Sequence, residues 1–225
     1  MKIYKNFNLQ KKHKRSIILI GNFDGVHLGH RKLFSLANKY KKKFNSNIGV
    51  LSFEPMPKMF FNKKIKNFRI SNFEQKISLL KKLGVDFIIN KKFDYKFSKT
   101  KSLDFIKKII YKKINANFIF LSNNFKFGNK REGDVSQLIN YENQYNYKIV
   151  KPEPLKINNK IVSSSLIRIF LKNGYLDKAN KLLRRNWSVI GKVEKGRQIG
   201  KKIGFPTCNI DIKDYVLAKP GVYAV

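Results

Sequence analysis

The chain has 225 residues, of which 42% are hydrophobic and 13% aromatic, so it can bury a substantial core and is not a disordered chain. It carries 49 lysine and arginine residues against 14 acidic ones, a formal net charge of +35. Nearly all of these cations are lysine, and abundant Lys, Asn, Ile and Phe are what A- and T-rich codons produce. Codon bias therefore explains the charge better than a dedicated nucleic-acid surface, because sequence-specific readers depend on arginine.

One cysteine, Cys208, and three histidines limit the chemistry of the chain. A single thiol cannot form an intrachain disulfide, and these few ligands leave almost no room for a structural metal such as a Cys/His zinc site. No apolar run approaches the roughly 20 residues that span a bilayer, and the N-terminus lacks the apolar region of a signal peptide. We expect a soluble, cytoplasmic protein that does not bind membranes.

Short apolar runs that stop at glycine or proline predict five buried strands, over residues 16–20, 48–53, 85–89, 117–121 and 147–150. Helical spacing predicts helices between them, over residues 31–44, 71–83, 103–114 and 134–145. The second of these helices begins with a predicted capping box, Ser71–Glu74, and ends at Gly84. This alternation predicts an α/β fold with a parallel sheet, whose ligands bind beyond the carboxyl ends of the strands.

The pattern changes after Pro154. Two short helices are predicted over residues 163–171 and 177–183. From Trp187 onward the sequence predicts a strand near residues 189–193, spaced glycines from Gly196 to Gly204 and a final apolar strand over residues 222–225. We therefore predict two domains, residues 1–186 and residues 187–225.

The strongest site signal is the sequence GNFDGVHLGH, from Gly21 to His30, where the first strand gives way to a helix. Gly21 and Gly25 permit a sharp turn, and Gly29 lets a phosphate approach the backbone. The helix directs its free amides and positive dipole end to the same place, beside the imidazoles of His27 and His30. Two of the three histidines thus lie where this fold binds ligands, which predicts an anion pocket.

The same segment resembles the His-x-Gly-His signature of nucleotidyltransferases, and the longer string resembles the opening motif of the bacterial FAD synthetase family. Four further motifs of that family follow in order: LSFEPMP from Leu51, NNFKFG with REGD from Asn123, VSSSLIR from Val162 and IGFPTCN from Ile203. The last motif resembles the start of a riboflavin kinase domain. The resemblance covers nearly the whole chain, and it implies a Rossmann-like nucleotidyltransferase domain followed by the start of an antiparallel β-barrel.

The resemblance implies adenylyl transfer from ATP to FMN, giving FAD and pyrophosphate, with Mg²⁺ entering with the ATP. His27 and His30 would bind the ATP phosphates and act as the catalytic pair. Further contacts with ATP and its phosphates are implied for Gly21, Asn22, Phe23, Asp24, Gly29, Ser164, Ser165 and Arg168. Substrate or Mg²⁺ orientation is implied for Asn124 and Asp24, and a flavin-facing wall for Phe53, Pro55, Pro57 and Phe60. Asn123 and Asn124 stand where acids are common in the family, which removes negative charge there.

In the second domain the resemblance implies that Thr207 and Asn209 contact Mg²⁺ and ATP for the phosphorylation of riboflavin. About forty residues cannot close a barrel, so we expect a fragment that lacks this kinase activity until the domain is completed. Two alternatives remain open from the sequence. The first is another His-x-Gly-His nucleotidyltransferase that acts on pantetheine phosphate, nicotinamide mononucleotide or glycerol phosphate. The second is a basic nucleic-acid-binding module.

Overall fold

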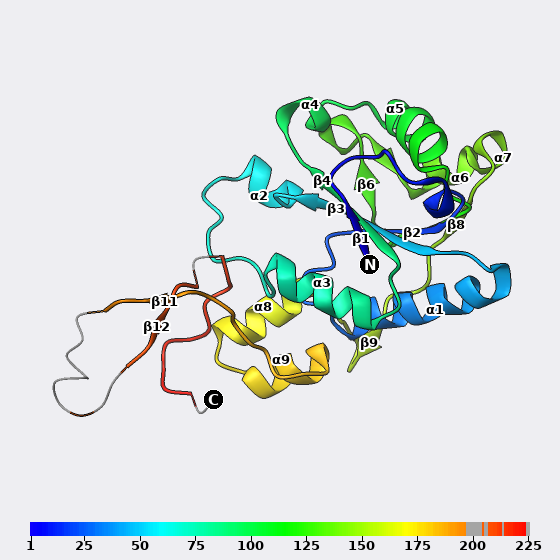
Figure 1. The fold of residues 1–225 in the computed structure, drawn as a ribbon. Helices are drawn as coiled ribbons and strands as arrows, with labels where there is room; N and C mark the ends of the chain where they lie inside the picture. The colour runs from blue at the N-terminus through cyan, green and yellow to red at the C-terminus, as the bar shows by residue number, and fades with distance from the viewer. Residues whose placement is uncertain (197–203, 205–206, 213, 224–225) are drawn as a thin grey trace.

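The computed structural model describes residues 1–196, 204, 207–212 and 214–223 (Figure 1). Its centre is a six-stranded sheet with the strand order β1-β4-β3-β2-β5-β8, in which every neighbouring pair is parallel. The strands are β1 (Lys2–Tyr4), β2 (Ile17–Ile20), β3 (Ile48–Glu54), β4 (Phe87–Lys92), β5 (Phe118–Phe120) and β8 (Lys148–Val150). The predicted α/β fold with a parallel sheet is confirmed.

Helices cover both faces of the sheet. All four side chains of β2 are therefore buried, which explains why its apolar run is continuous. Ile18 and Ile20 belong to the core on one face, and Ile17 and Leu19 belong to the core on the other. The first face is covered by α5 (Ser102–Asp104), the π-helix η2 (Phe105–Ile114), α6 (Val135–Asn140) and α7 (Glu142–Tyr145). The second face is covered by α1 (Leu28–Phe44) and α3 (Phe73–Lys82).

Two local predictions need correction, and one strand was not predicted. The capping box of α3 is formed by Asn72 and Gln75, one residue later than predicted, while the Ser71 hydroxyl accepts a hydrogen bond from the Gly25 amide. The predicted helix over residues 103–114 is a π-helix for most of its length. The edge strand β1 was not predicted, because three residues are too few to show a period.

A third apolar cluster lies beside the sheet and is built on α8 (Ser164–Lys172) and α9 (Leu176–Leu183). It also buries Ile70 and Val216, which come from distant parts of the chain. The remaining short elements are η1 (Lys11–His13), α2 (Pro57–Phe61), α4 (Tyr95–Ser98), β6 (Lys126–Phe127), η3 (Asn129–Arg131), β7 (Gly133–Asp134), β9 (Lys156–Ile157) and β10 (Lys160–Ile161). No helix in the described part of the chain is long and apolar enough to cross a membrane.

After Trp187 the described residues form one antiparallel ladder, β11 (Val193–Glu194) with β12 (Asn209–Ile210). The strand predicted over residues 189–193 is thus confined to Val193 and Glu194. The predicted final strand is not formed at Val222 and Tyr223, since no described segment pairs with them, and residues 224–225 lie outside the described part. Most of the glycine-rich stretch between Gly196 and Gly204 also lies outside it.

Candidate functional site

The loop between β2 and α1 makes the sharp turn that the sequence predicts. Phe23 and Val26 have φ values of 50° and 43°, a conformation that bulky and β-branched residues rarely adopt, and Gly25 has a φ of 76°. A side chain at Gly25 would place its Cβ 2.8 Å from Ile70 Cγ2. The turn is therefore held against the segment around Ile70, and it delivers His27 to the amino end of α1.

His27 and His30 form a stacked pair at the start of α1. Their ring centroids lie 3.7 Å apart with an interplanar angle of 20°, and His27 Nδ1 accepts a hydrogen bond from the His30 amide at 3.4 Å. His30 Nδ1 is buried and has no hydrogen-bond partner among the described residues. His30 also contributes to the lining of a cavity beside the amino end of α1, where free amides favour an anion.

Burial keeps both rings neutral at pH 7. It lowers the pKa of His27 to about 4, with a smaller contribution from the Arg168 charge. Burial and the neighbouring His27 ring lower the pKa of His30 well below 6.5. Both imidazoles are therefore neutral hydrogen-bonding groups at pH 7. A nearby negative charge would favour their protonated forms.

Asp24 and Arg168 form a buried ion pair across the loop, with Arg168 Nη2 2.6 Å from Asp24 Oδ2. The Asp24 carboxylate also accepts hydrogen bonds from the backbone amides of Ile70 and Ser71 at 3.1–3.2 Å. Arg168 Nε donates to the Phe68 carbonyl at 2.7 Å, and its guanidinium lies 3.7 Å from the Phe68 ring centroid. Asp24 thus fixes Arg168 and the loop through contacts within the protein.

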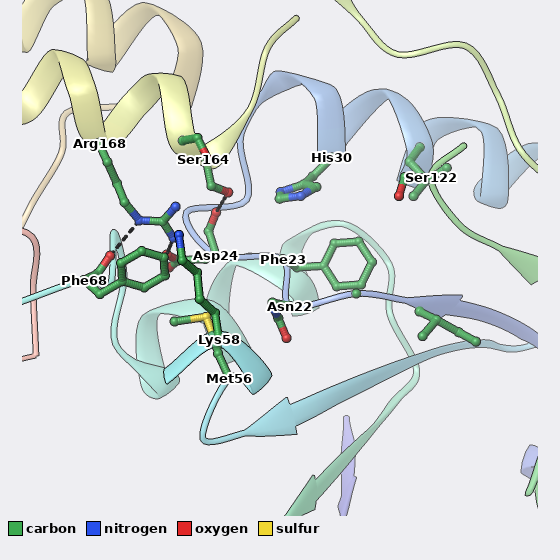
Figure 2. A pocket seen from close by; sticks show the side chains of 14 residues that line it. Asn22, Phe23, Asp24, His30, Met56, Lys58, Phe68, Ser122, Ser164 and Arg168 are labelled. Carbon is green, nitrogen blue, oxygen red and sulfur yellow. Dashed lines mark hydrogen bonds and ion pairs between the residues drawn. The ribbon is translucent and has the colours of Figure 1, made fainter. Parts of the chain in front are cut away.

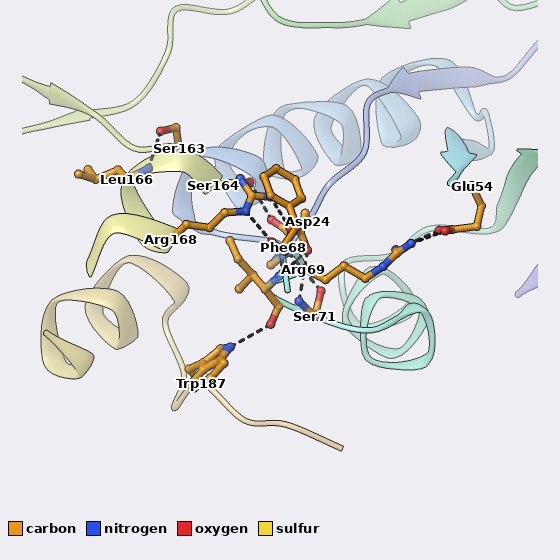
Figure 3. Close-up of polar contacts among 12 residues, drawn as sticks. Asp24, Glu54, Phe68, Arg69, Ser71, Ser163, Ser164, Leu166, Arg168 and Trp187 are labelled. Carbon is orange, nitrogen blue, oxygen red and sulfur yellow. Dashed lines mark hydrogen bonds and ion pairs between the residues drawn. The ribbon is translucent and has the colours of Figure 1, made fainter. Parts of the chain in front are cut away.

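Residues 68–71 connect parts of the site that are far apart in the sequence (Figure 3). Besides the contacts with Asp24 and Arg168, Arg69 forms an ion pair with Glu54 at the end of β3. The Ile70 carbonyl accepts a hydrogen bond from Trp187 Nε1 at 3.0 Å. The Arg69 carbonyl accepts one from the Val216 amide at 2.7 Å. We call this stretch the 68–71 segment.

A cavity of about 350 Å³ opens at the carboxyl end of β2, where the fold is expected to bind ligands (Figure 2). The structure brings together eight of the predicted site residues in its lining, namely Gly21, Asn22, Phe23, Asp24, His30, Ser164, Ser165 and Arg168. His27, whose ring stacks on that of His30, and Gly29 do not belong to the lining. A Cβ at Gly29 would lie 3.1 Å from the Val162 carbonyl oxygen, so the close packing of α1 also favours glycine there.

Other predicted residues lie outside the lining. Asn124 is exposed and accepts a hydrogen bond from Ser122, which does line the cavity. Phe53 packs in an aromatic cluster with Phe93 and Phe97, at centroid distances of 5.9 and 5.4 Å. The other predicted residues beyond the lining are Pro55, Pro57, Phe60, Thr207 and Asn209.

Six lining residues were not predicted: Ile20, Leu33, Met56, Lys58, Phe68 and Ser122. Met56 and Lys58 flank the second proline of the FEPMP sequence, so the motif itself was a signal for them. Phe68 lies in a loop without local pattern, and its place depends on contacts with Arg168 that are distant in sequence.

The described residues include no group of three or more His, Cys, Asp or Glu side chains that could hold a metal ion. The carboxylate of the cavity, Asp24, is occupied by Arg168 and two backbone amides. The oxygen ligands left among the described lining side chains are the amide oxygen of Asn22 and the hydroxyls of Ser122, Ser164 and Ser165. This donor set fits a divalent ion that arrives on phosphate oxygens better than one resident in the protein.

Comparisons with known proteins show the family of the chain. Residues 9–166 match the family model described as FAD synthetase, and residues 183–225 match the one described as riboflavin kinase. The bifunctional riboflavin kinase/FMN adenylyltransferase of Buchnera aphidicola from Schizaphis graminum is 41% identical over 97% of this chain and 70% of its own. The protein of the same description from Escherichia coli K12 is 32% identical over 93% of this chain and 67% of its own.

A crystal structure titled macrolide-efflux protein from Streptococcus pneumoniae has a TM-score of 0.84 and 27% identity, covering 98% of this chain and 72% of that one. A parallel sheet with an anion-directed cavity at its carboxyl edge defines an α/β nucleotide-binding protein. The chain belongs to the family of bifunctional riboflavin kinase/FMN adenylyltransferases, with an FAD synthetase part followed by riboflavin kinase sequence.

Proposed function

We propose that the chain transfers the adenylyl group of ATP to FMN, giving FAD and pyrophosphate. The observation that carries this proposal is the cavity at the end of β2, where His30, Ser164 and Arg168 meet the amino end of α1. Its residues fall within the stretch that matches the FAD synthetase model, apart from Arg168 just beyond it. The single cysteine suits a reducing cytoplasm, where we propose that the enzyme acts.

ATP binds with its phosphates at the amino end of α1. The free amides there and the helix dipole favour an anion, and His27 and His30 donate hydrogen bonds to phosphate oxygens. An approaching phosphate favours the protonated imidazole, so it raises the lowered pKa values of this pair. The site thus gains positive charge when the substrate supplies negative charge.

The reaction needs no protein nucleophile. A phosphate oxygen of FMN attacks the α-phosphorus of ATP in line, and pyrophosphate leaves with the electron pair of the broken P–O bond. The chain contributes positioning and charge neutralisation. Ser164, Ser165 and Arg168 hold the triphosphate from α8. Asp24 and the Phe68 carbonyl fix the Arg168 guanidinium in advance, so little reorganisation is needed.

The flavin ring packs beside the aromatic cluster at the end of β3 and β4. The ring centroids of Phe60 and Phe93 lie 5.2 Å apart, and Phe53 packs against Phe93 in the same cluster. With the neighbouring Pro55 and Pro57, these side chains offer flat apolar surface to an isoalloxazine ring. Asn124, held beside the cavity by Ser122, orients the substrate from the opposite side.

Mg²⁺ enters as part of the nucleotide substrate and supplies charge neutralisation on its phosphates. In the residues after the boundary that we place near 186, the riboflavin kinase match supports a second site. We propose that Thr207 and Asn209 contact ATP and Mg²⁺ there for the phosphorylation of riboflavin, on an antiparallel barrel. Both residues are exposed in the structure.

The test is to incubate the purified chain with FMN, ATP and Mg²⁺ and to measure FAD and pyrophosphate by chromatography. We expect FAD from the parent chain. His30→Ala should lower kcat/KM by about 100-fold, since one preorganised donor at a developing charge contributes about that much. His27→Ala should do the same but also loses the cap of α1, so its folding is checked by circular dichroism.

His13→Gln is the matched control, because His13 packs on Phe87 and does not line the cavity. When folded, it should retain the parent's kcat/KM. Absence of FAD from a folded parent chain, or equal loss of activity in His13→Gln and His30→Ala, would contradict the proposed function.

A further inference from the structure

The electrostatic balance of the cavity singles out Lys58. The basic side chains in the lining are His30, Lys58 and Arg168. The Arg168 charge is offset by Asp24 at 2.6 Å, and the lowered pKa of His30 leaves its ring neutral at pH 7. The contacts of Lys58 with other described residues include no carboxylate. The uncompensated positive charge of the described lining therefore comes from Lys58.

Lys58 lies at the same end of the cavity as Arg168. Its Nζ lies 5.3 Å from the centroid of the Phe68 ring, and the Arg168 guanidinium lies 3.7 Å from the same centroid. Figure 2 shows Lys58 and Arg168 near Ser164, away from Ser122. Lys58 is exposed on α2, so its ammonium group is free to move toward a ligand.

The phosphate end of the nucleotide is a better partner for Lys58 than the flavin. Side chains two positions apart on a helix do not share a face, and Phe60, two residues later on α2, packs on Phe93. The side chains of Phe60 and Lys58 thus leave α2 in different directions. Lys58 is directed instead to the region of Ser164 and Arg168, which hold phosphates in the proposed function.

We propose that Lys58 binds the β- and γ-phosphates of ATP and the pyrophosphate that leaves, an inference that rests on the proposed function. When the bond between the α-phosphorus and its bridging oxygen breaks, that oxygen keeps the electron pair and the pyrophosphate gains negative charge. A flexible ammonium group neutralises this charge as it develops. Lys58 therefore contributes to nucleotide binding and to the departure of the leaving group.

The test compares the parent chain with Lys58→Ala, Lys58→Arg and the control Lys63→Ala, an exposed lysine just beyond α2 that does not line the cavity. Steady-state kinetics give KM for ATP, KM for FMN and the inhibition constant of pyrophosphate. Lys58→Ala should raise the ATP KM and the pyrophosphate constant by about ten-fold, the size expected for one charge-assisted hydrogen bond. The KM for FMN should not change. Lys58→Arg should keep most of the parent's binding of ATP and pyrophosphate, and Lys63→Ala should match the parent.

Unchanged constants in Lys58→Ala, or a rise confined to the FMN KM, would overturn the inference while leaving the proposed function intact. If the parent makes no FAD, the proposed function fails, and calorimetry with pyrophosphate alone then tests Lys58 directly. Weaker pyrophosphate binding by Lys58→Ala than by the parent supports the inference, and equal or undetectable binding by both overturns it.

Discussion

His27 and His30 depend on each other because their rings are stacked inside the protein. A proton on one ring raises the cost of a proton on the other, and burial disfavours both charged forms. His30 retains a buried Nδ1 without a described hydrogen-bond partner. Such unsatisfied groups are costly and are typical of functional sites.

The histidine pair should make stability depend on pH. The folded pKa of His27, about 4, is below its unfolded value of about 6.5, so the unfolded chain binds more protons between these values. The stabilisation is complete above about pH 6.5 and is lost as pH falls toward about 4, with a loss of about 3 kcal/mol from His27. Urea unfolding at about pH 7.5 and about pH 5 should show about 2 kcal/mol of this loss.

His27→Gln is the comparison, because glutamine does not titrate and keeps hydrogen-bonding capacity at the cap. Its unfolding free energy should change less between the two pH values than that of the parent. An identical change in parent and variant would show that other groups cause the pH dependence.

At the scale of the element, the loop between β2 and α1 combines a positive φ with close packing. Phe23 and Val26 adopt left-handed backbone that costs free energy, and contacts of Asp24 and Gly25 with the 68–71 segment hold them there. The loop is therefore as rigid as the segment that supports it, which is suitable for a site that must position phosphates.

Gly25→Ala should lower the free energy of unfolding by about 2–3 kcal/mol, because it combines a strained φ with a Cβ 2.8 Å from Ile70 Cγ2. Gly174→Ala is the matched control. Gly174 has almost the same φ of 77°, but its Cβ would meet Lys219 at an ordinary 3.4 Å. It should cost about 1 kcal/mol, and denaturant unfolding of both variants measures the difference. Equal losses would mean that the contact with Ile70 adds nothing.

At the scale of the whole molecule, features that neighbouring residues specify could be predicted from the sequence. Contacts between residues far apart in the chain could not. The central strands and the turn after β2 follow from apolar runs, glycines and a helix start that neighbouring residues specify. The environment of Asp24 depends on residues 46 and 144 positions away, so its pairing with Arg168 and Ile70 had no sequence signal. The same reason explains why Phe68 was missed in the cavity lining.

The residues after Trp187 should contribute to the stability of the whole chain. Val216 is fully buried in the cluster with Ile70 and Ile167, whereas Val222 is fully exposed. Val216→Ala should lower the free energy of unfolding by about 2 kcal/mol, and Val222→Ala should leave it within about 0.5 kcal/mol. Urea unfolding followed by circular dichroism measures both, and equal values would show that the contact with Ile70 is not stabilising.

The 68–71 segment has a consequence for exchanging parts between relatives. It donates backbone hydrogen bonds to Asp24 and accepts hydrogen bonds from Arg168, Trp187 and Val216. These partners lie on both sides of the expected boundary near residue 186. A chimera joined at residue 186 would therefore combine a supporting surface from one parent with the residues that cover it from another. Compatible exchange requires that the 68–71 segment and its covering residues come from the same parent. A single junction near residue 186 does not meet this requirement, because the covering residues lie on both sides of it.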